Sequence, residues 1–186
     1  MKVCVHHNND IPEAVHMALA QERLHHRTKE GLFAPGPLPL EVEYIETPGL
    51  HGYGDSLARL WDLGKGFIIL EHDVAPWPGA LTELWNCPEP LCTLPVIFHG
   101  AINHTSFACV KFSEALVKKT QGIWKAYPRN DIFYWQGLDG WFNFQMEKRE
   151  EPIRRHSHRP PALHVEWEHT DPAYYELRPS QPDTLV

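Results

Sequence analysis

The sequence predicts an α/β fold in a single domain: a Rossmann-like, mixed but mostly parallel sheet flanked by helices. Three observations support this prediction. The chain opens with a short apolar strand, a polar turn and a helix. Strand and helix patterns then alternate as β-α-β-α-β, and Phe67–Leu70 is a continuous apolar run typical of a strand buried on both faces. A chain of 186 residues is long enough to bury one such core.

In the first half of the chain, residues 2–5 form the first predicted strand. The first helix should run from Pro12 to about Arg27, because Asp10 is suited to cap it and proline is favoured in a first turn. The later elements are a Pro/Gly-rich loop at 31–40, a strand at 41–45, a glycine-rich loop at 47–54 and a short amphipathic helix at 55–63.

The second half continues with short helix and strand patterns. A long helix at 131–148 is rich in aromatic residues, most of which we expect in the core. Residues 1–172 should form the domain, with 173–186 as a C-terminal tail without clear periodicity. The other elements are a helix at 79–86, strands at 93–98 and 106–112, a helix at 113–119 capped by Ser113, a charged surface loop at 150–161 and a last strand at 162–167.

The charge and composition narrow the classes of function. A net charge of −7 and a pI near 6.0 argue against a strongly basic nucleic-acid-binding surface. One basic cluster, made of Lys148-Arg149 and residues 154–159, could bind a pyrophosphate or a nucleic-acid backbone, or be a solvated loop. No apolar stretch approaches the roughly 18–20 residues that span a bilayer, and the chain begins with a strand pattern rather than an export signal. We therefore expect a cytoplasmic protein with reduced cysteines and no membrane partner.

Two carboxylates follow the buried strand directly. Residues two apart in an extended chain point the same way, so Glu71 and Asp73 should lie on one side of its carboxyl end. Ligands of open α/β sheets bind at such ends. Hard oxygen ligands there suit Mg²⁺ or Mn²⁺ carrying a phosphate-bearing substrate. The alternative is that both acidic residues simply end the strand and face water.

Three further residues could complete such a site. Asp139 lies among aromatic residues, where burial would raise its pKa towards that of a general base. Alternatively, it is a boundary residue that makes one hydrogen bond. His164 and His169 lie around the end of the last predicted strand, where either could reach the metal or be a surface histidine.

The spacing Cys87-x4-Cys92 raises the alternative of a zinc site. This spacing is longer than that of the usual close pair, and no second Cys/His pair follows at ribbon or finger spacing. We therefore expect these two thiols to be core residues.

Together these features resemble the glycosyltransferases of GT-A fold. The resemblance rests on the β-α-β-α-β order and the acid-x-acid motif, here Glu71-His72-Asp73 where the family usually has Asp-x-Asp. Three pieces in order are similar to small glycosyltransferase-like proteins of bacteriophages, and the likeness covers roughly residues 2–170. The pieces are Glu71-His-Asp-Val-Ala-Pro76 with Pro78-Gly-Ala-Leu81, Cys87-Pro-Glu-Pro-Leu-Cys92 and Cys109-Val-Lys-Phe-Ser113.

The resemblance implies a nucleotide-diphospho-sugar donor, with a UDP-sugar expected, whose two phosphates are bridged by Mn²⁺ or Mg²⁺ on Glu71 and Asp73. It implies that Asp139 is the base and that His169 or His164 completes the metal shell. The acceptor it suggests is a hydroxymethylated base in phage DNA, in the cytoplasm of a bacterial host. The residues expected to bind the nucleotide-sugar are His6, His7, Asn8, Tyr53, Gly54, Asp55, Arg59, His72, Arg155 and His158.

Two other functions stay open at this point. The same metal site would also serve a nucleotidyl- or phosphotransferase. If the acidic motif were inert, the chain would be a carbohydrate- or nucleic-acid-binding module without catalytic activity.

Overall fold

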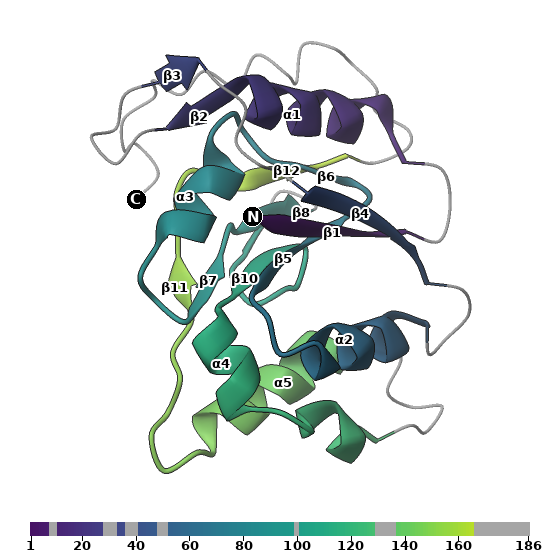
Figure 1. The fold of residues 1–186 in the computed structure, drawn as a ribbon, viewed down its shortest axis with the longest axis vertical. Coiled ribbons are helices and arrows are strands. Elements are labelled where there is room, and N and C mark those ends of the chain that lie inside the picture. Colours follow the sequence, from purple (N-terminus) through teal and green to yellow (C-terminus); the bar gives the residue numbers. More distant parts are fainter. Residues whose placement is uncertain are drawn as a thin grey trace.

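The protein has an α/β fold with a mixed, mostly parallel six-stranded sheet flanked by helices (Figure 1). This computed structural model describes residues 1–7, 11–27, 33–35, 41–47, 52–98, 101–128 and 137–165. The strands of the main sheet, in spatial order, are β11 (His156–Ser157), β7 (Leu91–Thr93), β10 (Cys109–Phe112), β5 (Phe67–Glu71), β1 (Lys2–His7) and β4 (Glu41–Glu46). The two pairs that β10 makes are antiparallel, and the other three are parallel.

Strand β5 confirms the buried strand predicted at Phe67–Leu70, whose residues are at most 2% exposed. It pairs in parallel with β1 and antiparallel with β10, so it lies inside the sheet. Its register with β1 sets His6 opposite Glu71 at the carboxyl ends of both strands. The predicted edge with polar side chains therefore exists.

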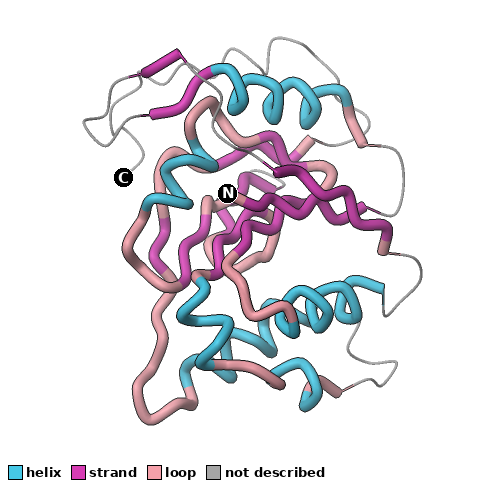
Figure 2. Tube along the Cα trace, viewed as in Figure 1, coloured by secondary structure: helices cyan, strands magenta, loops and turns pink. Residues whose placement is uncertain are grey.

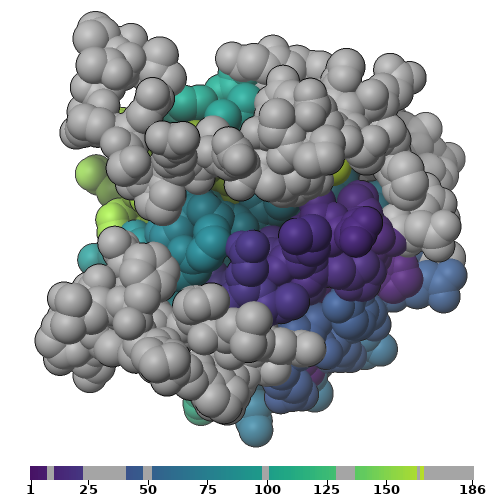
Figure 3. All heavy atoms as spheres, turned by 90° about the horizontal axis from the view of Figure 1, so that it is seen from above, coloured from purple at the N-terminus to yellow at the C-terminus, as the bar shows by residue number. Residues whose placement is uncertain are grey.

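Helices cover both faces of this sheet (Figure 2). Because side chains alternate along a strand, Phe67 and Ile69 join one core while Ile68 and Leu70 join the other. The N-terminal residues, in purple, adjoin the teal segment that contains α3 on one face (Figure 3). That face carries α1 (Glu13–Leu24) and α3 (Ala80–Asn86); the opposite face carries α2 (Gly52–Asp62), α4 (Glu114–Lys119), the 3-10 helix η1 (Ile123–Ala126) and α5 (Leu138–Glu147). None of the described helices is long and apolar enough to cross a membrane.

Aromatic side chains fill the core under α2 and α5, as the sequence predicts for most of them. Trp61 is 1% exposed, and its indole N–H donates to Thr120 Oγ1 at 2.8 Å. Its ring lies at centroid distances of 4.8–5.5 Å from four others, mostly edge to face, which is the favoured geometry for aromatic pairs. Those four rings are Phe67, Phe112, Trp124 and Phe142.

A second sheet corrects the strand predicted at 93–98. Pro95 has no N–H to donate, so pairing is interrupted there and the chain passes from β7 of the main sheet to β8 of another. The strands of this four-stranded sheet, in spatial order, are β6 (Val74–Ala75), β12 (Ala162–His164), β8 (Val96–Phe98) and β9 (Ala101–Asn103). Its β12–β6 pair brings the end of the described chain to the acidic motif.

Other boundaries differ where long-range pairing overrides local pattern. The first helix ends at Leu24 rather than near Arg27, because β2 (His25–Arg27) pairs with β3 (Phe33–Pro35) inside the predicted Pro/Gly-rich loop. The strand predicted at 106–112 begins only at Cys109, and the predicted loop at 150–161 contains β11. The cap of α4 is confirmed, since the N–H of Leu116 donates to Ser113 Oγ at 3.2 Å. Asp10, the start of the predicted aromatic helix at 131–136 and the tail at 173–186 lie outside the described residues.

Candidate functional site

The carboxyl ends of β1 and β5 meet at one edge of the main sheet. The N–H of His72 donates to the carbonyl of His6 at 3.1 Å, so the chain leaving β5 stays beside the end of β1. The N–H of Thr47 similarly donates to the carbonyl of His7 at 2.8 Å and ties the end of β4 to the same edge. Polar residues that follow three parallel strands are thereby collected together.

Asp73 and His164 lie in contact at this edge, as the sequence hypothesis required of one of the two late histidines. Nε2 of His164 is 3.1 Å from Oδ2 of Asp73, and the N–H of Val165 donates to the Asp73 carbonyl at 2.6 Å. Burial opposes ionisation of Asp73, but the hydrogen bond and charge of His164 outweigh it and hold the pKa of Asp73 below its usual value. His169 lies outside the described residues.

The pKa of Glu71 is shifted in the opposite direction to that of Asp73. Burial, followed by the negative charges of Asp73 and Asp139, raises the pKa of Glu71 to about 8. Burial and the same carboxylates raise the pKa of the neighbouring Tyr53 well above its usual value. Glu71, Asp73 and Asp139 thus form an acidic cluster in which the charges of Asp73 and Asp139 both act on Glu71, and a cation placed among them would relieve this repulsion.

Asp139 lies in the first turn of α5, where it accepts a hydrogen bond from the N–H of Gly140 at 2.8 Å. Burial raises the pKa of Asp139, while the charge of Arg155 acts in the opposite direction. The Arg155 guanidinium donates to Asn143 Oδ1 at 2.8 Å and to the Ser106 carbonyl at 2.7 Å. The structure therefore brings Arg155, one of the predicted donor-binding residues, near the predicted base.

His6 is 1% exposed and borders the acidic cluster. Its ring meets Tyr53 edge to face at 4.5 Å, and its Nε2 lies 3.3 Å from Ser56 Oγ. Burial, assisted by the positive charge of Arg59, lowers the pKa of His6 to about 4, so this imidazole is neutral at physiological pH. A neutral ring can accept or donate a hydrogen bond but adds no charge to the site.

The remaining predicted donor residues have varied surroundings. Arg59 is exposed and lies 3.6 Å from Glu43. The α-carbon of Gly54 faces side chains of the core, because a Cβ there would lie 3.6 Å from Leu138. His7 and His72 are partly exposed, Asp55 is exposed, and Asn8 lies outside the described residues.

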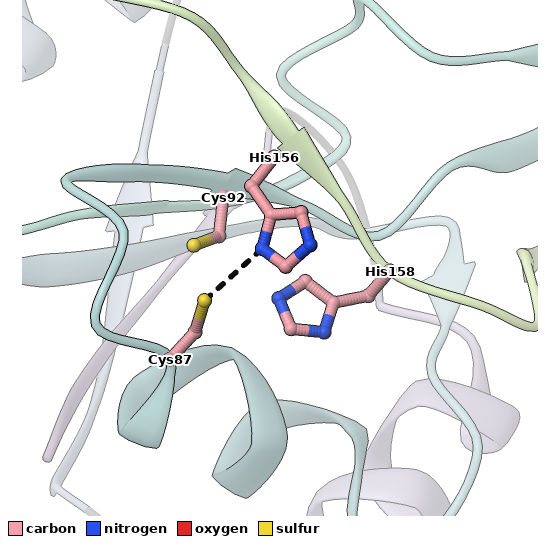
Figure 4. A group of neighbouring side chains, drawn as sticks. All are labelled: Cys87, Cys92, His156 and His158. Atoms are coloured by element: carbon pink, nitrogen blue, oxygen red, sulfur yellow. Dashed lines mark hydrogen bonds between the residues drawn. The ribbon is translucent and has the colours of Figure 1, made fainter.

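A second cluster, the Cys/His cluster, consists of Cys87, Cys92, His156 and His158 (Figure 4). One ligand atom from each residue lies within 4.8 Å of those from the other three. Cys92 belongs to the core under α3, as predicted for both thiols, but Cys87 is only partly buried and meets His156. Within the described ranges this is the one group of three or more such side chains this close together, so the acidic cluster is not a ready-made set of ligands.

Placement in this cluster separates His158 from the other predicted donor-binding residues. Its Nδ1 lies 2.8 Å from Glu83 Oε1 of α3, and this hydrogen bond raises the pKa of His158. Strands β7 and β10 lie between β11, which precedes His158, and β5, which carries Glu71. The two clusters also lie on opposite faces of the main sheet. Cys92 faces α3, whereas Glu71, in the alternation of Phe67 and Ile69, faces α2 and α5. The segment around Arg155 and His158 is thus divided between two clusters and does not form one basic loop.

Sequence reasoning missed the Cys/His cluster because its halves are far apart in the chain. The available signal was a pair of short motifs, Cys-x4-Cys and His-x-His, each uninformative alone.

The two cysteines of the cluster have pKa values shifted in opposite directions. Burial raises the pKa of Cys92 to about 12, opposed by the nearby Lys111 ammonium. Burial also opposes ionisation of Cys87, but hydrogen bonds from the Glu89 backbone and His156 outweigh it and lower its pKa to about 7.

Comparison with known proteins gives no relative: no protein-family model matches the chain, and no curated protein is significantly similar to it. The case for a function therefore rests on the residues of the site.

Proposed function

We propose that this chain is a metal-dependent glycosyltransferase that moves a sugar from a nucleotide-diphospho-sugar to an acceptor hydroxyl. The observation that carries the proposal is the contact of Asp73 with His164 beside Glu71 and Asp139, at the carboxyl ends of parallel strands. Ligands of α/β sheets bind at such ends. The acid-x-acid motif there resembles that of the GT-A glycosyltransferases.

Asp73, Glu71 and His164 would hold Mn²⁺ or Mg²⁺, for which carboxylate oxygens are suitable ligands. The ion would act as a Lewis acid on the leaving diphosphate. Oδ2 of Asp73 contacts His164, whereas its Oδ1 makes no hydrogen bond to another described residue. Oδ1 could therefore bind the ion directly. His169 remains a further predicted ligand.

Asp139 would act as the base. It would take the proton of the acceptor hydroxyl while that oxygen forms a bond to the anomeric carbon and the bond from that carbon to the diphosphate breaks. Burial, which raises the pKa of Asp139, makes its carboxylate a better proton acceptor. Arg155, held by Asn143 and Ser106, would offer positive charge to the phosphates on the same side.

The proposed donor is a UDP-sugar, and the proposed acceptor is a hydroxymethylated base in phage DNA. Because the chain carries a net charge of −7, contact with DNA would have to be local, for example through the basic residues around Arg154. A nucleotidyl- or phosphotransferase would use the same carboxylates. Analysis of the products formed from a nucleotide-sugar separates these reactions, because only sugar transfer releases an intact nucleoside diphosphate.

A thermal-shift panel of nucleotide-sugars with and without added Mn²⁺ tests the proposal. A ligand at about 100 times its Kd stabilises the folded state by about 2.7 kcal/mol, which gives a measurable rise in Tm. We expect one nucleotide-sugar to raise Tm only with Mn²⁺, and Asp73→Asn to abolish that rise. Chelators are avoided here, since they would also strip other metals.

Either of two results would contradict the proposal. One is a panel without any Mn²⁺-dependent shift. The other is an Asp73→Asn variant that binds donor normally in Mn²⁺. Binding without any transfer or hydrolysis of the sugar would instead support a carbohydrate-binding module.

A further inference from the structure

We propose that Cys87, Cys92, His156 and His158 form a structural zinc site, distinct from the acidic cluster. Cys87 directly follows α3 and Cys92 lies in β7, while the two histidines come from β11 and the residue after it. Their ligand atoms converge on one point between the helix end and the strand (Figure 4). The proposal does not rest on the glycosyltransferase proposal, because none of its four ligands has a role in that one.

The donor set selects zinc. Two sulfurs and two imidazole nitrogens are the ligands of tetrahedral zinc sites, whereas Mg²⁺ and Mn²⁺ prefer oxygen. Ligand atoms around zinc lie roughly 3.3–3.8 Å apart, given Zn–S and Zn–N bonds of about 2.3 and 2.0 Å. Cys87 Sγ and His156 Nδ1 are already 3.1 Å apart, and none of the four atoms is farther than 4.8 Å from another. Small side-chain rotations therefore suffice to close the site.

His158 is oriented as a zinc ligand would be. Its Nδ1 is taken by Glu83 Oε1 at 2.8 Å, and its Nε2 is buried without a hydrogen-bond partner among the described residues. A buried nitrogen without a partner is costly, and a metal would satisfy it. The chain carboxylate–histidine–metal is the usual way in which proteins fix the ring and tautomer of such a ligand.

Lys111 of β10 supports the cysteine side of the site. It is only 3% exposed, and its ammonium donates to the carbonyl of Cys87 at 2.5 Å. A buried ammonium requires a compensating negative charge, and Cys92 lies beside it in the β10–β7 register. Zn²⁺ bound by two thiolates has no net charge. The positive charge of Lys111 and the negative charge of Glu83 then offset one another across the site.

The site would be structural because four protein ligands leave no open position for substrate. Its role would be to hold β11, which has two residues and two register pairs, on the edge of the main sheet. Arg155 immediately precedes β11 and reaches Asn143 and Ser106 beside Asp139. Zinc would thus fix the strand that presents Arg155 to the acidic cluster.

Elemental analysis of the full chain, purified without chelators, tests the proposal. We expect about one zinc per chain, a lower Tm after zinc is removed by a competing chelator, and recovery with Zn²⁺ but not Mg²⁺. Cobalt offers a readout that needs no variant: Co²⁺ bound to the emptied protein should show thiolate-to-metal charge-transfer absorption.

Variants assign the ligands. Cys87→Ser and His156→Gln, at partly or fully exposed positions, should fold but reduce bound zinc at least tenfold. Two controls should keep zinc at the parental level: Cys4→Ala removes a thiol from the other core, and His104→Gln removes a histidine whose Nδ1 lies 3.0 Å from Ser157 of β11.

Three results would overturn the proposal. They are parental protein that neither contains zinc nor gains Tm with it, a Cys87→Ser variant with full zinc content, and a disulfide between Cys87 and Cys92 in protein purified without reductant. Counting of thiols in denaturant detects the third outcome, because only two of the four cysteines would then react.

Discussion

His164 Nε2 lies 3.1 Å from Asp73 Oδ2, which joins strand β12 to the acidic motif after β5. The pairing of His164 with Val74 and the hydrogen bond from Val165 to the Asp73 carbonyl hold this contact in place. The two side chains are 19% and 20% exposed, so solvent screens their interaction only in part. Any ligand of Asp73 is therefore also a neighbour of His164.

Replacement of His164 should affect both folding and metal binding. His164→Gln leaves Asp73 partly buried with a weaker partner, and we expect a loss of about 1 kcal/mol in the free energy of unfolding. Mn²⁺-dependent stabilisation by donor should weaken as well. Denaturant titration with and without Mn²⁺ and donor measures both effects. His104→Gln, at an exposed site, is the control; an equal loss in both variants would speak against a role for His164.

Asp139→Asn should separate catalysis from binding. Asparagine keeps the size of the side chain and an oxygen that can accept from the N–H of Gly140, so folding and donor affinity should survive. Transfer should slow by about 10²–10⁴-fold, the usual contribution of a general base. The measurements are Tm, donor affinity and transfer rate on this one variant. A well-folded variant that transfers sugar at the parental rate would exclude Asp139 as the base and direct attention to Asp131, Glu166 and Glu168, which lie outside the described residues.

Glu22 should make stability depend on pH. Its buried carboxylate accepts from the N–H of Leu81 at 2.9 Å and from the hydroxyl of Thr82 at 3.2 Å, at the start of α3. Burial outweighs these bonds and raises the pKa of Glu22 from 4.5 to about 7. The charge of Glu22 in turn helps to raise the pKa of the buried Cys109 thiol. Between these pH values the folded protein keeps a proton that the unfolded chain has released.

The contribution of Glu22 to the free energy of unfolding should therefore fall as pH rises from about 4.5 to about 7 and then level off. The fall attributable to Glu22 is at most about 3.4 kcal/mol, at 1.36 kcal/mol per unit of pKa. Glu22→Gln should flatten this part of the profile and be the more stable protein at pH 8. Denaturant titrations across pH 4–8 test this, and parallel profiles for the two proteins would contradict it.

Two glycine replacements should have opposite effects. A Cβ at Gly66 would lie 2.8 Å from the backbone N of Glu114 and 3.1 Å from the Phe112 carbonyl, so Gly66→Ala should cost about 1–3 kcal/mol through overpacking. Nothing lies within 4 Å of a Cβ at Gly140, inside α5, so Gly140→Ala should stabilise the helix by up to about 1 kcal/mol. Comparison of their melting temperatures tests both, and a fall in Tm for Gly140→Ala would show that α5 needs this glycine for another reason.

Much of the fold was predictable because it depends on local pattern. The apolar run at Phe67–Leu70 required a strand buried on both faces, and the N-terminal alternation of strands and helices required a parallel arrangement. The edge that carries Glu71 and Asp73 followed from these two features. Pro95 is itself a local signal for the interruption of strand pairing, but no local pattern indicates that β8 joins another sheet.

The sequence by itself determined the succession of β1, β4 and β5 along the chain, the burial of β5 and the two carboxylates at its end, since side-chain periodicity and chain direction are written locally. Only the tertiary structure decided which distant segments meet there. Pairing of β12 with β6 brings His164 to Asp73, and pairing of β11 with β7 brings His156 to Cys92. Such pairings depend on the register of strands far apart in the chain, and a shift of one residue would turn each of these side chains to the other face of its sheet. That is why His158, grouped by sequence with the donor-binding residues, instead lies with two cysteines under α3.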